Sequence, residues 1–293
     1  CATRMGVTGT VQNGPEGVLI EAQGLHLDAF VRMLQEQAPP LARIDSLVQL
    51  PMAAVDDHGF EILATPSAAA TGAAIPADTA ICQACLRELF DPANRRYLHP
   101  FIACCDCGPR FTMTRRLPYD RANTSMAAFP LCQACQAEYT DPGSRRFHAE
   151  PVACHDCGPR LSRDIRALAD ALTAGGIVAI KGLGGYHLAC NARDDIAVAR
   201  LRAGKLRDAK PLAVMVLNTA SAAQHVQLNP VGTELLLSPE RPVVVLPAAS
   251  AGRELSPALS PGLATLGLML PYTAIHYLLF HALLGSPAGA RWL

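Results

Sequence analysis

Eight of the eleven cysteines in this chain form four Cys-x-x-Cys pairs. Eighteen residues separate the two pairs of each module, and the second module repeats the first fifty residues later. Two residues between thiolates let one tight turn present both sulfurs to a tetrahedral zinc ion, and a second turn completes the four ligands. The spacing therefore predicts two structural zinc ions, held by Cys82, Cys85, Cys104 and Cys107 and by Cys132, Cys135, Cys154 and Cys157.

Other chemistry of these cysteines is less favoured by the pattern. A reducing cytosol disfavours disulfides. A redox Cys-x-x-Cys motif needs one pair at the start of a helix, not four pairs in a repeat. Iron stays open as an occupant, because four thiolates suit both metals. A set of four sulfurs leaves no open coordination position, so the metal is expected to be structural.

Three histidines lie close to these cysteines in the sequence: His99, His148 and His155. Each could replace a thiolate ligand, although a position on the surface or behind the ligands is the simpler interpretation. Cys105 is an extra cysteine that we interpret as a bystander.

The charge balance excludes a global electrostatic attraction to polyanions, since 25 basic residues meet 25 acidic ones. The sequence shows no secretory signal and no run of 18 apolar residues, so no membrane association and a cytoplasmic location are expected. The length predicts two or three domains. Because the chain begins with Cys1 and ends on the apolar residues of Arg291-Trp292-Leu293, we expect a fragment.

The residues before the cysteines predict a small α+β domain of the ferredoxin-like kind. Strands are expected at 7–12 and 18–22 around a turn, then a helix from Leu27 to Leu34, then two short strands at 44–50 and 60–63. The stretch 64–77 is rich in Ala, Thr, Ser, Gly and Pro, as linkers are.

The residues after the cysteines alternate between helix and strand, which predicts an α/β domain with a largely buried sheet. Helices are expected at 165–172 and 196–206, and a strand followed by a core-facing helix within 266–284. The further strands are expected at 177–180, 212–216 and 243–246.

Two segments of this region could bind an anion. The run from Lys181 to His187 places glycines after a strand, where backbone N–H groups can approach a phosphate. Downstream, basic residues gather before Pro211: Arg202, Lys205, Arg207 and Lys210. Such a cluster can neutralise a triphosphate, although a solvated basic helix end would have the same composition.

The motifs between the cysteines resemble those of the HypF carbamoyltransferase family. They are Pro-Tyr-Asp-Arg at 118–121, Met-Ala-Ala-Phe-Pro-Leu-Cys at 126–132 and Arg-Arg-Phe-His at 145–148. The resemblance implies a multidomain α+β chain with an N-terminally truncated, ferredoxin-like acylphosphatase domain over 1–66. It further implies tandem zinc-ribbon modules over 78–161 and a C-terminally truncated YrdC-like α/β domain over 163–293. The family's C-terminal transferase domain has no counterpart here.

The family supplies the cyanide ligands of [NiFe]-hydrogenases from carbamoyl phosphate and ATP. The resemblance implies that ATP with Mg is a substrate, that carbamoyl-adenylate forms, and that the C-terminal cysteine of a HypE-type partner is carbamoylated. The motif Lys-x-Arg-x-x-Lys-Pro-Leu looks like the nucleotide-binding signature of YrdC-type enzymes. It implies that ATP and carbamate are bound by Lys181, Lys205, Arg207 and Lys210, with Tyr186 and His187 as further pocket candidates.

Asn13 matches the asparagine that positions the attacking water in acylphosphatases, although a turn residue would look the same. The arginine loop of that family would precede Cys1, so efficient acyl phosphate hydrolysis is not expected. The YrdC-like site departs from its family at Gly204, where a larger residue is common. Its closing Thr-Ser-Gly/Ala-Asn segment would follow Leu293.

Two other functions remain open from the sequence. The tandem zinc modules could dock a nucleic acid or a protein, but they lack the aromatic stacking platform of single-strand binders, so nucleic acid is not expected. A YrdC-type enzyme of tRNA threonylcarbamoylation is the second alternative. Such enzymes do not need tandem cysteine modules.

Overall fold

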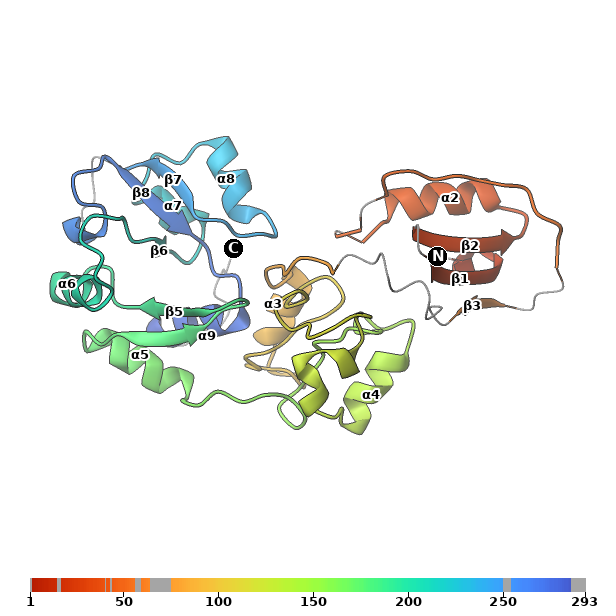
Figure 1. Cartoon of the computed structure of the whole chain (residues 1–293), viewed down its shortest axis with the longest axis horizontal. Coiled ribbons are helices and arrows are strands. Elements are labelled where there is room, and N and C mark those ends of the chain that lie inside the picture. The colour runs from red at the N-terminus through yellow and green to blue at the C-terminus, as the bar shows by residue number, and fades with distance from the viewer. Residues whose placement is uncertain are drawn as a thin grey trace. The chain divides into compact units, whose positions relative to one another are not determined.

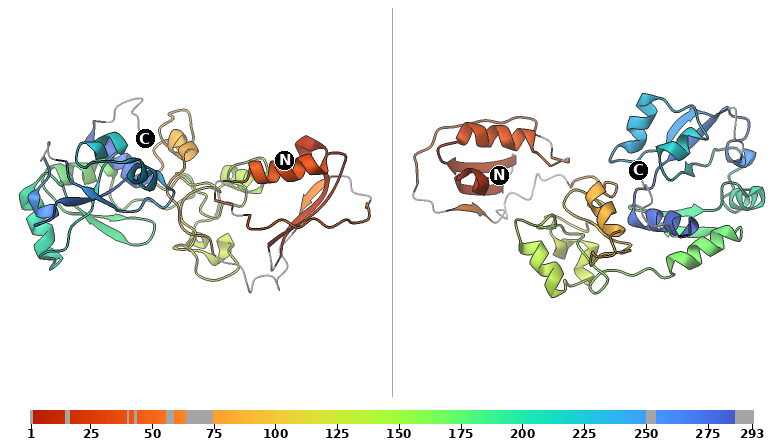
Figure 2. Two further views of the ribbon diagram at one scale, coloured as in Figure 1. Left: turned by 90° about the horizontal axis from the view of Figure 1, so that it is seen from above. Right: turned by 180° about the vertical axis from the view of Figure 1, so that it is seen from behind.

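The computed structural model of the protein forms two compact units (Figures 1 and 2). One unit comprises Cys1–Ile75 with Arg115–Asn123, and the other comprises Pro76–Thr114 with Thr124–Leu293. No helix in the part of the chain that the structure describes is long and apolar enough to cross a membrane. The described residues are 2–14, 17–39, 41–42, 44–55, 59–63, 75–249 and 254–285. Most of the predicted linker, 64–74, lies outside them.

The first unit is built on a three-stranded sheet covered by one helix (Figure 1). Strand β1 (Thr8–Gly14) pairs antiparallel with β2 (Gly17–Gln23) and parallel with β3 (Phe60–Ile62), which confirms those predicted strands. Helix α2 (Leu27–Glu36) confirms the predicted helix; its buried Phe30 packs edge-on against Phe60 of β3. A one-turn helix that the sequence did not predict, α1 (Ala2–Met5), completes the unit.

The strand predicted for 44–50 is wrong. The segment has no ladder partner within the described residues, and Val48 and Leu50 are 78% and 81% exposed. A strand needs a neighbour for its backbone groups and a core for its apolar face. The apolar residues of this segment suggested the strand, but in the described residues the sheet consists of β2, β1 and β3.

In the second unit, each cysteine module begins with a short helix. Helix α3 (Gln83–Leu89) follows Cys82, and α4 (Gln133–Thr140) follows Cys132. The 3-10 helix η3 (Ser125–Ala128) lies between the modules in sequence, and η2 (Arg121–Asn123) belongs to the first unit.

The α/β region contains the predicted helices and strands, but the strand expected at 212–216 is reduced to two residues. Strand β5 and the helices α7, α8 and η4 were not predicted. The helices are α5 (Ile165–Thr173), α6 (Asp195–Gly204), α7 (Thr219–Ala223), α8 (Pro230–Leu237), η4 (Pro257–Leu259) and α9 (Ala274–Leu283). The strands are β4 (Val178–Lys181), β5 (Tyr186–Ala189), β6 (Val214–Met215), β7 (Val244–Pro247) and β8 (Thr265–Met269).

These strands form two separate sheets. One of the strands, β8, has three consecutive buried residues. Strand β8 lies between β6, parallel to it, and β7, antiparallel to it, with Leu266 and Leu268 in the core. Strands β4 and β5 form an antiparallel hairpin in which Tyr186 is 73% exposed. The expectation of a largely buried sheet is therefore wrong for this hairpin, because only one of its faces meets a core.

Helix α9 joins the first cysteine module to the α/β region. Tyr277 and Leu278 of this helix belong to one core together with residues of α3. Ile275 and Leu279 belong to a second core, with residues of α5 and β4, and α5 lies beside α9 (Figures 1 and 2). A helix buried on two sides is apolar almost all round, as this one is. The first module therefore shares a hydrophobic core with the α/β region.

Candidate metal centres and nucleotide site

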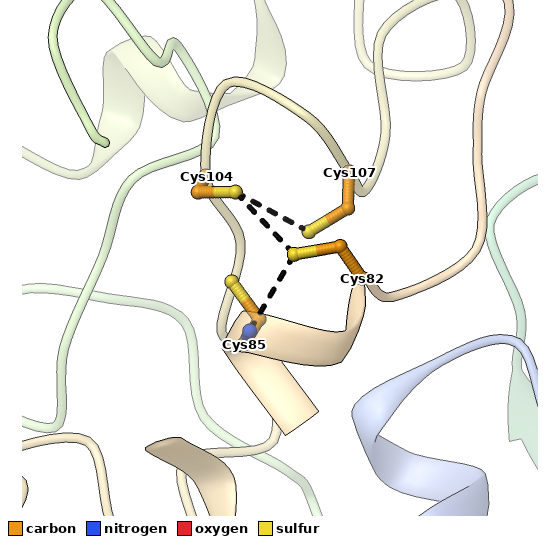
Figure 3. A group of neighbouring side chains, drawn as sticks. All are labelled: Cys82, Cys85, Cys104 and Cys107. Carbon is orange, nitrogen blue, oxygen red and sulfur yellow. Dashed lines mark hydrogen bonds between the residues drawn. The ribbon is translucent and has the colours of Figure 1, made fainter. Parts of the chain in front are cut away.

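The first set of four cysteines converges on one point (Figure 3). The four Sγ atoms lie within 4.8 Å of one another, with Cys82 3.7 Å from Cys104 and Cys104 3.8 Å from Cys107. A tetrahedral zinc ion with Zn–S bonds near 2.3 Å has sulfur–sulfur edges of about 3.8 Å, whereas a disulfide bond is about 2.05 Å long. The geometry fits a metal and not a disulfide.

The second set has the same geometry. Its four Sγ atoms also lie within 4.8 Å of one another, and Cys154 is 3.7 Å from both Cys132 and Cys157. Both predicted ligand sets are therefore assembled, and two structural zinc sites are supported.

The neighbouring histidines and the extra cysteine are not ligands in this arrangement. Nε2 of His155 is 2.8 Å from the carbonyl oxygen of Tyr97, and the ring of His155 lies against that of His99. Burial lowers the pKa of His99 to about 3, so its ring is neutral. Cys105 is exposed and donates its S–H to the carbonyl of Phe147.

Helix starts and glycines shape the cysteine turns. Cys82 is the N-cap residue of α3, and its Sγ accepts the backbone N–H of Cys85 at 3.4 Å. Gly108 has φ +91°, and a Cβ there would lie 2.9 Å from Cβ of Ala103. At the equivalent Gly158 a Cβ would lie 2.7 Å from a side-chain carbon. Only glycine fits behind the last sulfur of each module.

One cysteine of the second site, Cys132, favours the thiolate before any metal binds, whereas burial raises the pKa of Cys135 and of Cys154. Burial opposes ionisation of Cys132, but the Cys135 N–H, the Cys154 thiol and Arg95 outweigh it and lower the pKa of Cys132 to about 6. Because the thiolate is the form that binds metal, this residue is a competent ligand at neutral pH.

Arginines of each module reach the cysteines of the other. Arg95 of the first module donates to Sγ of Cys154 at 3.2 Å and of Cys135 at 3.4 Å. Arg145, its equivalent in the repeat, donates to Sγ of Cys104 at 3.2 Å. Four thiolates around a divalent zinc carry a net negative charge, so these guanidinium groups stabilise the sites electrostatically.

Two glutamates also link the modules, because each accepts hydrogen bonds from arginines of the other module. Glu138 accepts hydrogen bonds from Arg95 and from the almost fully buried Arg96, whose Nη1 is 2.9 Å from Oε1. Glu88 accepts from Arg145 at 2.7 Å and also from Arg146. Burial opposes ionisation of both glutamates, yet the arginines hold the pKa of each below its usual value. The Arg-Arg pairs were visible in the sequence as part of the repeat, but their partners were not.

The glycine-rich run forms the turn between β4 and β5. Lys181 donates from Nζ to the carbonyl of Gly184 at 2.7 Å, and its ammonium lies 5.4 Å from the ring centre of Tyr186. The backbone N–H of Gly182 donates to the carbonyl of Gly185 at 2.9 Å. The ammonium group of Lys181 therefore forms its hydrogen bond within the turn between β4 and β5.

Tyr272 meets this turn and was missed by the sequence analysis. Its hydroxyl is 2.7 Å from Nε2 of His187. A Cβ on Gly182 would lie only 2.3 Å from that hydroxyl, so glycine is needed for the tyrosine to approach. The backbone carbonyl of Tyr272 accepts the N–H of Ile81 at 3.0 Å, which ties this residue to the first cysteine module.

The substitution Gly182→Ala is expected to break the hydrogen bond between Tyr272 and His187. Its loss should lower the free energy of unfolding by about 1 kcal/mol. Gly185→Ala is the control in the same turn, because a Cβ there meets no atom within 4 Å. Thermal unfolding of the two variants measures the difference. Equal stability would mean that Tyr272 does not pack over Gly182.

The basic residues after α6 differ in their exposure and in their hydrogen bonds. Lys205 and Lys210 are exposed, whereas Arg207 donates to the carbonyls of Lys210 at 3.2 Å and Pro211 at 2.6 Å. The three lysines of the chain are Lys181, Lys205 and Lys210, so every lysine belongs to the predicted nucleotide site. Within the described residues no hydrogen bond joins Lys181 to the other two, and their common role stays a prediction.

Asn13 lies on β1 opposite Val18, next to the turn of the first hairpin. Its side chain is outside the described part of the structure. Its role in positioning water therefore stays a prediction.

Comparison with known families divides the chain into three parts. Residues 1–62 match the acylphosphatase family. Residues 81–114 and 131–163 match the family described as HypF finger. Residues 170–288 match the Sua5, YciO and YrdC family, described as telomere recombination.

Individual relatives match across these parts. Carbamoyltransferase HypF2 of Cupriavidus necator is 53% identical, over all of this chain and 38% of its own length. Carbamoyltransferase HypF of Rhizobium leguminosarum is 52% identical, over 96% of this chain and 37% of its own. The crystal structure of full-length HypF in the phosphate- and nucleotide-bound form has a TM-score of 0.87 and 42% identity, covering 96% of this chain and 38% of that one.

Proposed function

Because this chain is homologous over its whole length to the HypF carbamoyltransferases, we propose that it provides the zinc-binding and nucleotide-binding parts of a carbamoyltransferase of hydrogenase maturation. The chain spans about 38% of the length of its relative, so we assign to it the steps that its own domains can perform. The observation that carries this assignment is the match, with a TM-score of 0.87, to HypF in a phosphate- and nucleotide-bound form.

The reaction we assign to the α/β region is adenylation of carbamate. A carbamate oxygen attacks the α-phosphorus of MgATP, the bond to the bridging oxygen breaks, and pyrophosphate leaves with the electron pair. The exposed ammonium groups of Lys205 and Lys210 would hold the phosphates, and Lys181 would act from the glycine turn, with Tyr186 and His187 beside it. Arg207 supports the loop that carries the two exposed lysines.

The remaining steps are the supply of the carbamate and the transfer of the carbamoyl group. In the whole carbamoyltransferase, hydrolysis of carbamoyl phosphate in the acylphosphatase-like domain would supply the carbamate, and Asn13 of this chain would orient the attacking water. The carbamoyl group of carbamoyl-adenylate would pass to the C-terminal cysteine thiolate of a HypE-type partner, and AMP would leave. We expect this chemistry in the cytoplasm.

The two zinc ions are assigned a structural role. Each site offers four protein thiolates, which leaves no open coordination position for a substrate. Zinc would hold the cysteine turns in place and so support α9, which shares the core of the first module.

Lys205→Ala is expected to weaken binding of MgATP by about 10-fold, because one charge-assisted hydrogen bond to a phosphate contributes about 1.5 kcal/mol. Calorimetric titration of ATP in the presence of Mg measures this loss. Arg193→Ala is the control, since that arginine pairs with Glu254 on the surface, where both side chains are more than half exposed.

A second measurement uses the small number of lysines. With only Lys181, Lys205 and Lys210 in the chain, an amine-reactive label followed by mass spectrometry reports on the predicted site alone, apart from the N-terminus. MgATP should slow labelling of all three. A wild-type protein that neither binds ATP nor protects these lysines would refute the proposed function.

A further inference from the structure

Arg202 is a buried arginine beside the exposed lysines. It lies in the last turn of α6 and is 8% exposed. Its guanidinium donates to three carbonyls of the following basic loop, defined here as residues 205–211. These acceptors are Arg207 at 2.7 Å, Asp208 at 3.3 Å and Lys210 at 3.3 Å.

The same guanidinium also contacts η4. It donates to the carbonyls of Ala258 and Leu259, the latter at 3.2 Å. The carbonyl of Leu259 in turn accepts the N–H of Leu212 at 2.9 Å. One side chain therefore connects the end of α6, the basic loop and η4 through backbone acceptors only.

Burial of this charge is costly for the protein. A guanidinium loses its hydration when it is buried, and here carbonyl dipoles, without a carboxylate among the described residues, offset that loss. An apolar side chain would fill the position without this penalty. What the arginine provides is a fixed path for the loop.

The loop needs such support because its conformation is unfavourable. Leu206 has φ +48°, a left-handed conformation that is unfavourable for a leucine. Its side chain is 90% exposed, so no buried contact offsets that cost. The N–H of Arg207 donates to the carbonyl of Arg202 at 3.1 Å, which closes the turn around Leu206.

This arrangement favours phosphate binding. Three carbonyl oxygens that would repel a phosphate are paired with the guanidinium. Lys205 and Lys210 remain exposed, and neither forms an ion pair with a carboxylate in the described ranges of the chain.

We propose that Arg202 is a positioning residue for the nucleotide: it fixes the basic loop in the conformation in which Lys205 and Lys210 bind the phosphates, and does not itself contact ATP. The inference rests on the proposed function of this loop. It adds to that function a residue whose loss should weaken binding of a nucleoside triphosphate more than binding of a monophosphate.

The test compares Arg202→Met with Arg200→Met, a control on the same helix. Arg200 is exposed and donates to the carbonyl of Gly175, away from the basic loop. Arg202→Met should weaken binding of MgATP on the order of 10-fold or more, because hydrogen bonds from a charged group are lost. Binding of AMP should change less than about twofold, and Arg200→Met should leave both affinities near wild type.

A second readout is independent of nucleotide. Backbone amide hydrogen exchange in residues 206–210 should be faster in Arg202→Met than in Arg200→Met. Arg202→Lys, which keeps the charge but offers three donors, should lie between wild type and Arg202→Met. It also serves as the test if the methionine variant does not fold.

The outcomes separate the two claims. Equal loss of ATP and AMP affinity, or unchanged exchange in the loop, would overturn the role of Arg202 while leaving the nucleotide site in place. No ATP binding by the wild type, with faster loop exchange in Arg202→Met, would instead overturn the proposed function and with it the nucleotide role of the loop.

Discussion

Replacing Cys85 with alanine is expected to release one zinc ion and to loosen the α/β region, whereas Cys135→Ala should release one zinc ion and leave that region folded. The two residues occupy equivalent positions in the repeat, and both are fully buried. Cys85 belongs to the core that contains Tyr277 and Leu278 of α9, and Cys135 does not. Loss of the first site therefore exposes a core that the α/β region shares.

The expected size of the effect follows from the metal. Structural zinc contributes about 10–16 kcal/mol of binding free energy in small modules, which is comparable with the entire stability of a domain, about 5–15 kcal/mol. Even a fraction of this loss should raise amide hydrogen exchange throughout α9. Elemental analysis should give two zinc ions per wild-type chain and one in either variant.

Two results would contradict this expectation. Fewer than one zinc ion in reduced, metal-supplied wild-type protein would refute the metal assignment. Equal exchange of α9 in Cys85→Ala and Cys135→Ala would show that the first site is not coupled to the α/β region.

The metal ligands could be predicted because their pattern is local. Each knuckle needs two cysteines three positions apart, and the repeat shows which pairs belong together. The helices α5, α6 and α9 could also be predicted, since their apolar residues fall at helical spacing.

The contacts that the sequence could not show join residues far apart in the chain. Arg95 lies 59 positions before its acceptor Cys154, and Tyr272 lies 85 positions after His187. The sequence places Arg202 in a basic cluster with Lys205. Their different roles become visible only in the structure, where Arg202 is buried and Lys205 is exposed. The wrong strand at 44–50 has the same origin, because pairing of an extended apolar segment with a sheet depends on long-range contacts that its own residues do not show.

The second large effect is expected at the ion pairs that join the two cysteine modules. Glu138→Ala should destabilise the folded protein by about 3 kcal/mol, because it leaves the buried Arg96 without its carboxylate partner. The same substitution removes the acceptor of Arg95, which also donates to the sulfurs of the second site. The second zinc ion should therefore be lost to a chelator sooner than the first.

An exposed ion pair in the same chain provides the comparison. Arg193 and Glu254 are 2.8 Å apart, but their side chains are 56% and 66% exposed, so Glu254→Ala should cost less than about 1 kcal/mol. Denaturant unfolding with zinc at saturation measures both variants. If Glu138 acts through Arg96, the double variant with Arg96→Met will be less destabilised than the sum of the single variants, since no unpaired buried charge remains. Additive losses would mean that the two residues stabilise the modules independently.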